Sequence, residues 1–167
     1  MARKVILFGA LFFSGLVAGA AFVIWIEYNP SDLAASGYTE SMQHAIQVFT
    51  VPLPTIVMLS VLFTGASSVL AWRERPIFYL LAAGCFCAVV VAVVTVFGNV
   101  PINNQIKTWT VASPPSNWSD FANAWWRFQS VRTIAALAGL MLVILATLNT
   151  QKISGKNHLN SPKRRAD

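Results

Sequence analysis

Four long apolar segments alternate with shorter polar segments along the chain. A helix needs about 20 residues to cross the hydrocarbon core of a bilayer, and each apolar segment is close to this length. The pattern predicts an all-α membrane protein in which four helices form a transmembrane bundle. The predicted helices cover residues 5–26, 48–71, 77–97 and 131–148.

The connections between these segments are short. Only "WRERP" (residues 72–76) separates the second segment from the third, which predicts a tight turn between antiparallel helices with Pro76 at a helix start. None of the connections is long enough for a separate soluble domain. We therefore expect one transmembrane domain over residues 1–150, followed by a basic tail over residues 151–167.

Composition and charge add an orientation. The chain is 56% hydrophobic and 11% charged, whereas soluble domains are roughly 25% charged. Basic residues concentrate in short cytoplasmic loops, so the N and C termini are both expected in the cytoplasm and the protein in the plasma (inner) membrane. Basic residues that lie beside anionic lipid and set the topology account for the net charge of +6, so nucleic-acid binding is not needed to explain it. The residues behind this orientation are nine of the twelve basic ones: Arg3, Lys4, Arg73, Arg75, Lys152, Lys156, Lys163, Arg164 and Arg165.

The first apolar segment could be a cleaved signal peptide. It continues through "FVIWI" after its small residues, however, which favours a retained helix.

Three features of the apolar segments concern helix packing. Cys85 and Cys87 are expected to be small buried hydrophobes and not a redox pair. "GLVAG" (residues 15–19) predicts a face for close helix contact, while Pro52 and Pro54 predict a bend in the second helix.

Polar residues collect at the opposite side of the membrane. The two connections there, residues 27–47 and 98–130, carry acids, amides, a histidine and several tryptophans. Each of the four helices therefore brings hydrogen-bonding groups to the same outer level. We expect the two connections to form an outer cap on the bundle.

The start of the fourth helix carries a mixed stripe. Trp125, Phe128, Gln129 and Arg132 recur at i, i+3, i+4 and i+7, which is one face of a helix. Two rings, an amide and a cation could line a cavity for a flat, partly polar molecule. The alternative is an interfacial aromatic belt with Arg132 reaching toward lipid phosphates.

Two further residues at the outer level have acid-base chemistry. His44 can take and return a proton near neutral pH, which makes it a candidate general base. Glu27 is attached to a spanning helix and is costly there unless it is paired, with His44, Arg127 or Arg132 as expected partners. Glu27, Glu40 and His44 could also hold a metal, although the spacing of metal-binding motifs is missing, so no metal is expected.

The stretch "NVPINNQIKTWT" (residues 99–110) follows the third helix. Gly98 is expected to end that helix in a left-handed cap, and Pro101 suits the first turn of a short new helix lying on the membrane surface. Asn103 and Asn104 would then lie near the bundle axis. They are candidates for substrate binding, with turn formation as the alternative.

These motifs resemble a known family. "NVPINNQIKTW" followed some twenty residues later by "WWRFQSVRT" is similar to elements of the anthrone oxygenase-like integral membrane proteins (DUF1772). The matching positions are Pro101, Asn103, Asn104, Trp125, Phe128, Arg132 and Thr133. "EYNP" (residues 27–30) and "MQHAI" (residues 42–46) look similar to elements of some bacterial members, while Gln129 stands where the family often has asparagine.

The resemblance implies a four-helix fold and, for some members, oxidation of an anthrone by molecular oxygen without a classical cofactor. On this reading His44 would be the base, with Glu27 orienting it, and Arg132 with Asn103 or Asn104 would stabilise the oxyanion. Trp125, Phe128 and Gln129 would hold the substrate. The partners would be membrane lipid and a lipophilic small molecule, with a homo-oligomer left open.

Other functions fit the same pattern. A non-catalytic protein that binds lipid or quinone, or an accessory subunit of a membrane complex, would need the same apolar helices. A transporter is less favoured, because four helices without inverted repeats make a poor alternating-access machine.

Overall fold

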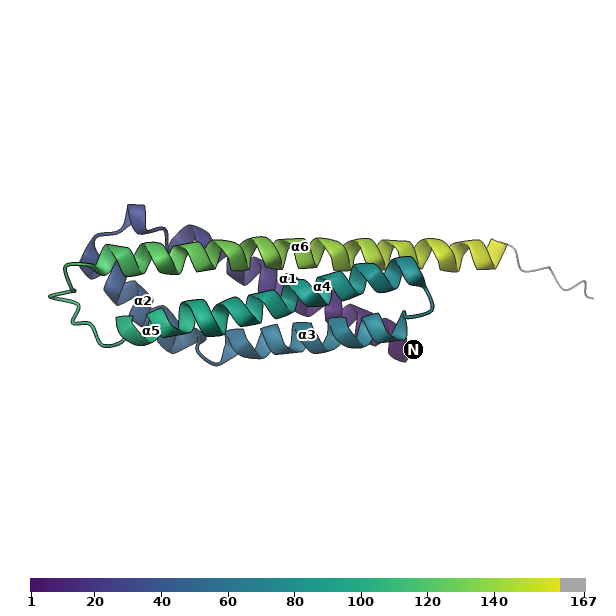
Figure 1. The fold of residues 1–167 in the computed structure, drawn as a ribbon. Helices are drawn as coiled ribbons and strands as arrows, with labels where there is room; N and C mark the ends of the chain where they lie inside the picture. Colours follow the sequence, from purple (N-terminus) through teal and green to yellow (C-terminus); the bar gives the residue numbers. More distant parts are fainter. Residues whose placement is uncertain (160–167) are drawn as a thin grey trace, which may run out of the picture.

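Four long helices dominate the computed structural model, which describes the backbone of residues 1–159 and the side chains of residues 1–150 (Figure 1). They are α1 (Ala2–Glu27), α3 (Pro52–Leu70), α4 (Arg75–Val94) and α6 (Trp118–Leu159). Each belongs to a segment that is long and apolar enough to cross a membrane, as the sequence predicts. The protein is therefore an all-helical, multi-pass integral membrane protein.

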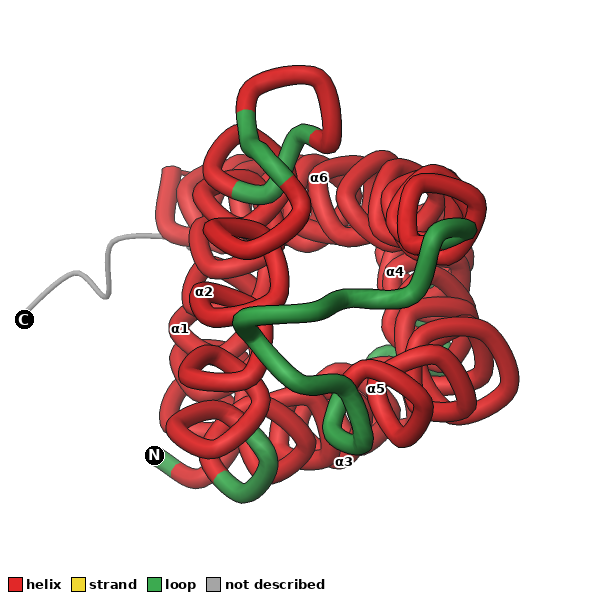
Figure 2. The backbone as a smooth tube through the Cα atoms, turned by 90° about the vertical axis from the view of Figure 1, so that its left-hand side faces the viewer, coloured by secondary structure: helices red, strands yellow, loops and turns green. Residues whose placement is uncertain are grey.

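The four helices form a ring seen from the end in Figure 2, in which α1 and α4 each pack against both α3 and α6. Small residues permit the closest approach: a methyl group added at Gly84 would lie 3.2 Å from Val143 and 3.4 Å from the Gly139 carbonyl oxygen. Large apolar side chains such as Phe12, Leu62 and Phe86 point outward and are exposed. This distribution suits a bundle whose surroundings are lipid.

The start of α1 and the C-terminal part of α6 lie at the same end of the bundle as the α3–α4 turn, because the four spanning helices alternate in direction (Figure 1). Arg3, Lys4, Arg73 and Arg75 belong to this end, so the predicted basic cluster is brought together there. Which side of the membrane it faces stays a prediction. Of the other predicted topological residues, Lys163, Arg164 and Arg165 lie outside the described residues, as do the side chains of Lys152 and Lys156.

The opposite end carries the shorter elements. These are a 3-10 turn η1 (Pro30–Asp32), helix α2 (Ala35–Phe49), a π-helical segment η2 (Thr95–Asn99) and helix α5 (Val100–Ile106). Helix α2 packs against α5, and the connection between α5 and α6 crosses over the end of the ring (Figure 2). Residues from both polar connections therefore lie at this end of the bundle.

The predicted second helix was wrong at its start. The structure has a break at Thr50 and Val51, so α2 ends at Phe49 and α3 begins at Pro52. Pro52 and Pro54 lack backbone N–H groups and cannot continue the hydrogen bonding of the preceding helix, but they suit the first turn of a new one. The expected bend is therefore a full break between two helices.

The predicted end of the third helix was also wrong. Gly98 does not adopt a left-handed conformation, and the chain continues through η2 directly into α5, which extends α4 (Figure 1). Pro101 explains the change, because its ring clashes with the carbonyl of residue i−4 and it has no N–H to donate. The π-helical turn, in which the Val100 N–H bonds to the Thr95 carbonyl, accommodates the proline. Helix α5 therefore does not lie along the membrane surface.

The "GLVAG" face does not mediate close helix contact within this chain. A methyl group added at Gly15 or Gly19 would meet no atom within 4 Å among the described residues. The close glycine contact of α1 lies instead at Gly9, whose added methyl group would fall 2.4 Å from the Phe63 ring. Register along the helices, and not glycine spacing alone, decides which face packs.

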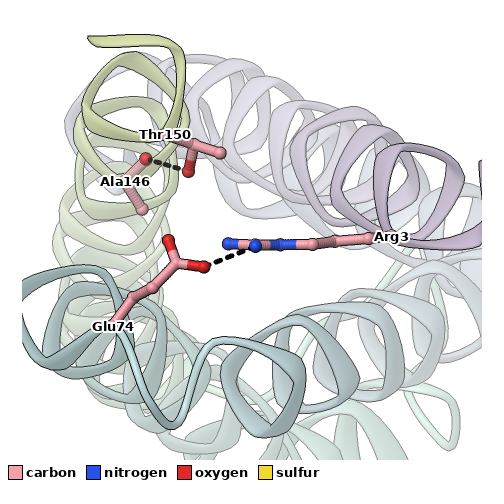
Figure 3. Close-up of polar contacts among 4 residues, drawn as sticks. All are labelled: Arg3, Glu74, Ala146 and Thr150. Carbon is pink, nitrogen blue, oxygen red and sulfur yellow. Dashed lines mark hydrogen bonds and ion pairs between the residues drawn. The ribbon is translucent and has the colours of Figure 1, made fainter. Parts of the chain in front are cut away.

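An ion pair closes the end that carries the termini. Figure 3 shows Arg3 reaching across to Glu74 in the α3–α4 turn, beside Thr150, whose hydroxyl donates to the Ala146 carbonyl oxygen at 2.9 Å. Hydrogen bonding and charge attraction from Arg3 lower the pKa of the Glu74 carboxyl below its ordinary value. This pair fixes the loop between α3 and α4 to the start of α1.

The Arg3–Glu74 pair predicts a small pH dependence of stability. Because the folded-state pKa of Glu74 is lowered, its stabilisation is present above the pKa of the unfolded chain and is lost as the pH falls through the folded value. Both side chains are partly exposed, so the loss should be less than about 1 kcal/mol. Thermal melts at pH 6 and pH 3 should show a smaller difference for Glu74→Gln than for wild type. Equal differences would contradict the assignment.

Candidate functional site

A cavity of about 420 Å³ lies between the helices in the half of the bundle that carries α2 and α5. Most of its walls are apolar side chains from α2, α3 and α4, including Ile46, Leu53, Val57 and Val89. This volume is within the range typical of small-molecule sites, about 300–1,000 Å³. A few polar side chains reach into these apolar walls: Tyr28, Thr50, Thr95, Asn103, Asn104, Lys107 and Arg132, with the Trp125 indole beside them.

Trp125 and Asn103 line one side of the cavity, and Asn99, which does not line it, bonds to the Trp125 backbone. The Trp125 Nε1–H donates to the Asn103 Oδ1 atom at 2.8 Å, which ties α6 to α5. The Asn99 side-chain amide donates to the Trp125 carbonyl oxygen at 3.2 Å, which ties α6 to η2. Asn104 also lines the cavity but is exposed. The stretch that follows the third helix is thus built into the site.

Arg132 reaches the same cavity from one and a half to two turns further along α6. Its Nε atom is buried and has no hydrogen-bond partner among the described residues. No acidic side chain among the described residues lies within ion-pair distance of it, so the pairing with Arg132, one of three that the sequence suggests for Glu27, is not present. A buried cation without a protein partner is costly, and an anionic or hydrogen-bond-accepting ligand would relieve that cost.

Phe128 and Gln129, predicted to bind substrate, do not line the cavity. The Phe128 ring packs on Gly98, where an added methyl group would lie 2.7 Å from ring carbons, and it is otherwise exposed. Gln129 is fully buried and donates from Nε2 to the Ala21 carbonyl oxygen at 2.9 Å. The two side chains therefore attach α6 to η2 and to α1, on either side of the Trp125–Arg132 face.

His44 and Glu27 lie away from the cavity. His44 is exposed on the other side of α2, where it borders an open surface hollow with Glu40, Gln43 and Gln47. Glu27 is also exposed and contributes nothing to the cavity lining. The structure does not bring these two residues to Asn103, Trp125 and Arg132, because α2 turns Met42 and Ile46 inward and His44 outward.

Glu27, Glu40 and His44 are the side chains that the sequence suggests as metal ligands. Within residues 1–150, no three His, Cys, Asp or Glu side chains gather closely enough to hold a metal ion. The two cysteines lie partly buried on α4 as free thiols, and Cys85 approaches the Val61 carbonyl oxygen at 3.8 Å.

Helix α2 closes the cavity from the outer side. The Gln43 amide donates to the carbonyl oxygens of Ile106 and Trp109, both at 2.9 Å, and so completes the C-terminal end of α5. Beneath it lies a buried cluster that includes Tyr38, whose hydroxyl has no partner among the described residues. Burial raises the pKa of Tyr38, so the phenol stays neutral. The members of this cluster are Tyr38, Met42, Ile46, Ile106, Ala122 and Trp125.

A family model described as anthrone oxygenase matches residues 42–142, which is more than half of the chain. The chain belongs to the anthrone oxygenase family. The match runs from Met42 in α2 to Leu142 in α6 and so includes most of the cavity lining. No curated protein and no solved structure matches the chain.

Within this anthrone oxygenase family member, four predicted site residues meet at one cavity: Asn103, Asn104, Trp125 and Arg132. The sequence analysis did not identify Lys107, which also lines the cavity, or Asn99 and Gln43, which bond to elements around it. Asn99 lies in the motif but gave no separate signal. Lys107 lies in the same stretch but received no interpretation from the sequence. Its place at the end of an amide-rich turn could have suggested a role beside Asn103.

Proposed function

We propose that this chain is a membrane oxygenase that oxidises a planar, lipophilic anthrone-like compound with molecular oxygen in the cavity beside Arg132. The observation that carries the proposal is the buried, unpartnered Arg132 Nε atom in an otherwise apolar cavity, in a member of the anthrone oxygenase family. We further propose that it works in the plasma membrane with the α2–α5 end facing outward.

Each polar or aromatic residue of the cavity has a different role in this proposal. The Trp125 indole offers a flat surface for aromatic rings, and its bond to Asn103 holds it in place. Asn104 offers an amide to a polar substituent of the substrate. Arg132 keeps its positive charge at all physiological pH values and can donate to the substrate oxygen. The apolar walls exclude water, which strengthens that interaction.

The proposed chemistry needs no protein group to change its oxidation state. Loss of a proton from the substrate CH₂ group gives a delocalised oxyanion, which Arg132 stabilises. This anion gives an electron pair to O₂, and a carbon–oxygen bond forms at the former CH₂ carbon. Protonation yields a hydroperoxide, and loss of water leaves a carbonyl group. One anthrone and one O₂ thus give one anthraquinone and one H₂O.

The proton can leave without a base in the cavity wall. A fixed positive charge beside the substrate oxygen favours its ionised form and so makes the substrate more acidic. Water at the exposed rim beside Asn104 and Lys107 can then accept the proton. This differs from the role that the sequence suggested for His44, whose side chain lies on the outer surface of α2.

The proposal is tested by oxygen uptake. Purified protein in lipid nanodiscs, given 1,8-dihydroxy-9-anthrone, should consume one O₂ per anthrone and form the anthraquinone faster than protein-free nanodiscs do. His44→Ala should retain most of this rate, because His44 does not reach the cavity. Uptake no faster than the lipid control would remove the oxygenase function. Loss of activity in His44→Ala would return that residue to the mechanism.

One observation favours a second candidate, a non-catalytic protein that binds a lipophile such as a quinone. Neither a histidine nor a carboxylate among the described residues lines the cavity. A protein that only binds its ligand needs no such general base. In that case the nanodiscs should bind the anthraquinone and show no oxygen uptake above the control.

A further inference from the structure

The cavity opens sideways, toward the lipid. Several of its lining residues are also exposed on the outer surface of the bundle: Phe49 by 38%, Met58 by 59%, Val96 by 55% and Val100 by 38%. Phe49 ends α2 and Met58 lies in α3, whereas Val96 and Val100 belong to η2 and α5. All four are apolar, so this opening suits contact with the bilayer and not with water.

The end of the bundle is closed. The connection between α5 and α6 crosses it, and α2 is bonded to that connection through Gln43 (Figure 2). Directly beneath lies the buried cluster around Tyr38 and Trp125 defined above. A ligand that came along the axis from water would have to displace this cluster, whereas the sideways route needs no such movement.

The charged side chains that line the cavity are both positive. Lys107 and Arg132 are its charged lining residues, and no carboxylate among the described residues lines it. The acids of this end, including Asp32 and Glu40, are exposed elsewhere, and no acid in the described chain pairs with Lys107. A ligand that carries negative charge would therefore meet attraction and no opposing carboxylate.

The two cations lie at different depths. The Asn103–Trp125 bond sets α5 and α6 at a common level, with Lys107 one helical turn outward and Arg132 nearly two turns inward. At 1.5 Å per residue, their backbones are about 17 Å apart along the axis. Lys107 lies at the exposed rim and Arg132 in the interior. One ligand group can thus occupy the interior while another stays at the rim.

We infer that the cavity takes a lipophilic acid from the bilayer, through the opening between the α2–α3 junction and α5, with the acid group held by Lys107. The inference rests on the proposed function for the interior of the cavity and adds the class of substrate and its route. Lys107 is then a specificity-determining residue, which prefers a ring system bearing a carboxylate over the same ring system without charge.

The charge preference is tested by binding, which does not require turnover. Wild-type protein in phosphatidylcholine nanodiscs is titrated with anthraquinone-2-carboxylate and with anthraquinone-2-carboxamide, which share one ring system. Wild type should bind the carboxylate about fivefold more tightly, a preference typical of a partly exposed charge pair. Lys107→Gln should lose the preference and keep its affinity for the carboxamide. Arg127→Gln, an exposed arginine on α6 outside the cavity, should behave as wild type.

An unchanged preference in Lys107→Gln would overturn the inference, as would equal binding of both probes to wild type. If the substitution changes only the amount of anionic phospholipid that copurifies, Lys107 is a lipid contact and the inference is wrong. Failure of oxygen uptake in the separate anthrone assay would remove the oxygenase reaction but leave these binding results unaffected.

The route is tested by narrowing the opening. Val96→Trp places a large ring at the rim, whereas Val93→Trp places it on an exposed part of the same helix that does not line the cavity. The association rate of anthraquinone-2-carboxylate should fall about tenfold in Val96→Trp and stay unchanged in Val93→Trp. Wild-type rates in both variants would overturn the sideways route.

Discussion

Replacing Arg132 with glutamine is expected to lower the rate of anthrone-dependent oxygen uptake about 100-fold, the usual cost of removing one group that stabilises a developing oxyanion. Glutamine keeps a hydrogen-bond donor at this position but lacks the charge that favours the ionised substrate. The effect should fall on kcat more than on KM, because the oxyanion is fully formed only after the proton has left. Oxygen-electrode kinetics in nanodiscs measure both parameters.

Two comparisons separate this effect from misfolding. Arg127→Gln removes an exposed arginine of the same helix and should leave the rate unchanged. The Arg132→Gln protein should melt no lower than wild type, since it loses a buried charge that has no partner among the described residues. A wild-type rate in Arg132→Gln would contradict the proposed mechanism. A strongly lowered melting temperature would mean that Arg132 has a structural partner in the bilayer.

Replacing Gly98 with alanine is expected to lower the melting temperature by several degrees, corresponding to about 1–3 kcal/mol of overpacking. The added methyl group would lie 2.7 Å from two carbons of the Phe128 ring, which is too short for a van der Waals contact. Alanine has the better helix propensity by about 1 kcal/mol, so the steric conflict has to exceed that gain. Thermal melts in one detergent compare the variants.

The matched control is Gly19→Ala, where the new methyl group meets open space and helix propensity alone should act. That variant should be as stable as wild type or slightly more so. The double variant Phe128→Ala/Gly98→Ala should recover part of the lost melting temperature, because it removes the ring with which the new methyl group clashes. If Gly98→Ala melts as wild type does, Phe128 does not pack on η2, and its predicted role in substrate binding should be tested again.

The arrangement of the cavity shows where sequence patterns reach their limit. The i, i+3, i+4, i+7 spacing correctly places Trp125, Phe128, Gln129 and Arg132 on adjacent parts of one helix surface. That surface is wide enough to meet three neighbours: α1 receives Gln129, η2 receives Phe128, and the cavity receives Trp125 and Arg132. Periodicity along one helix cannot say which neighbour each residue faces.

His44 illustrates the same limit on α2. Its type and its place near other polar residues made it a candidate base, but the side of α2 that turns inward is set by Met42 and Ile46. These apolar side chains pack on Ile106 and Trp125 of other elements. One helical turn offers only one inward face, so His44 is placed outward beside Glu40.

The sequence by itself determined the four spanning helices, the family and the motif residues Asn103, Trp125 and Arg132, because hydrophobic length and local spacing are properties of the chain. Only the tertiary structure decided that Pro101 produces a π-helical turn and a continuing helix. It also decided that, among the described residues, an added methyl group at Gly15 or Gly19 meets no atom within 4 Å and the Arg132 Nε atom has no partner. These outcomes depend on how the helices are rotated and how deep each lies against the others. Packing across the whole bundle sets that rotation, and no local segment encodes it.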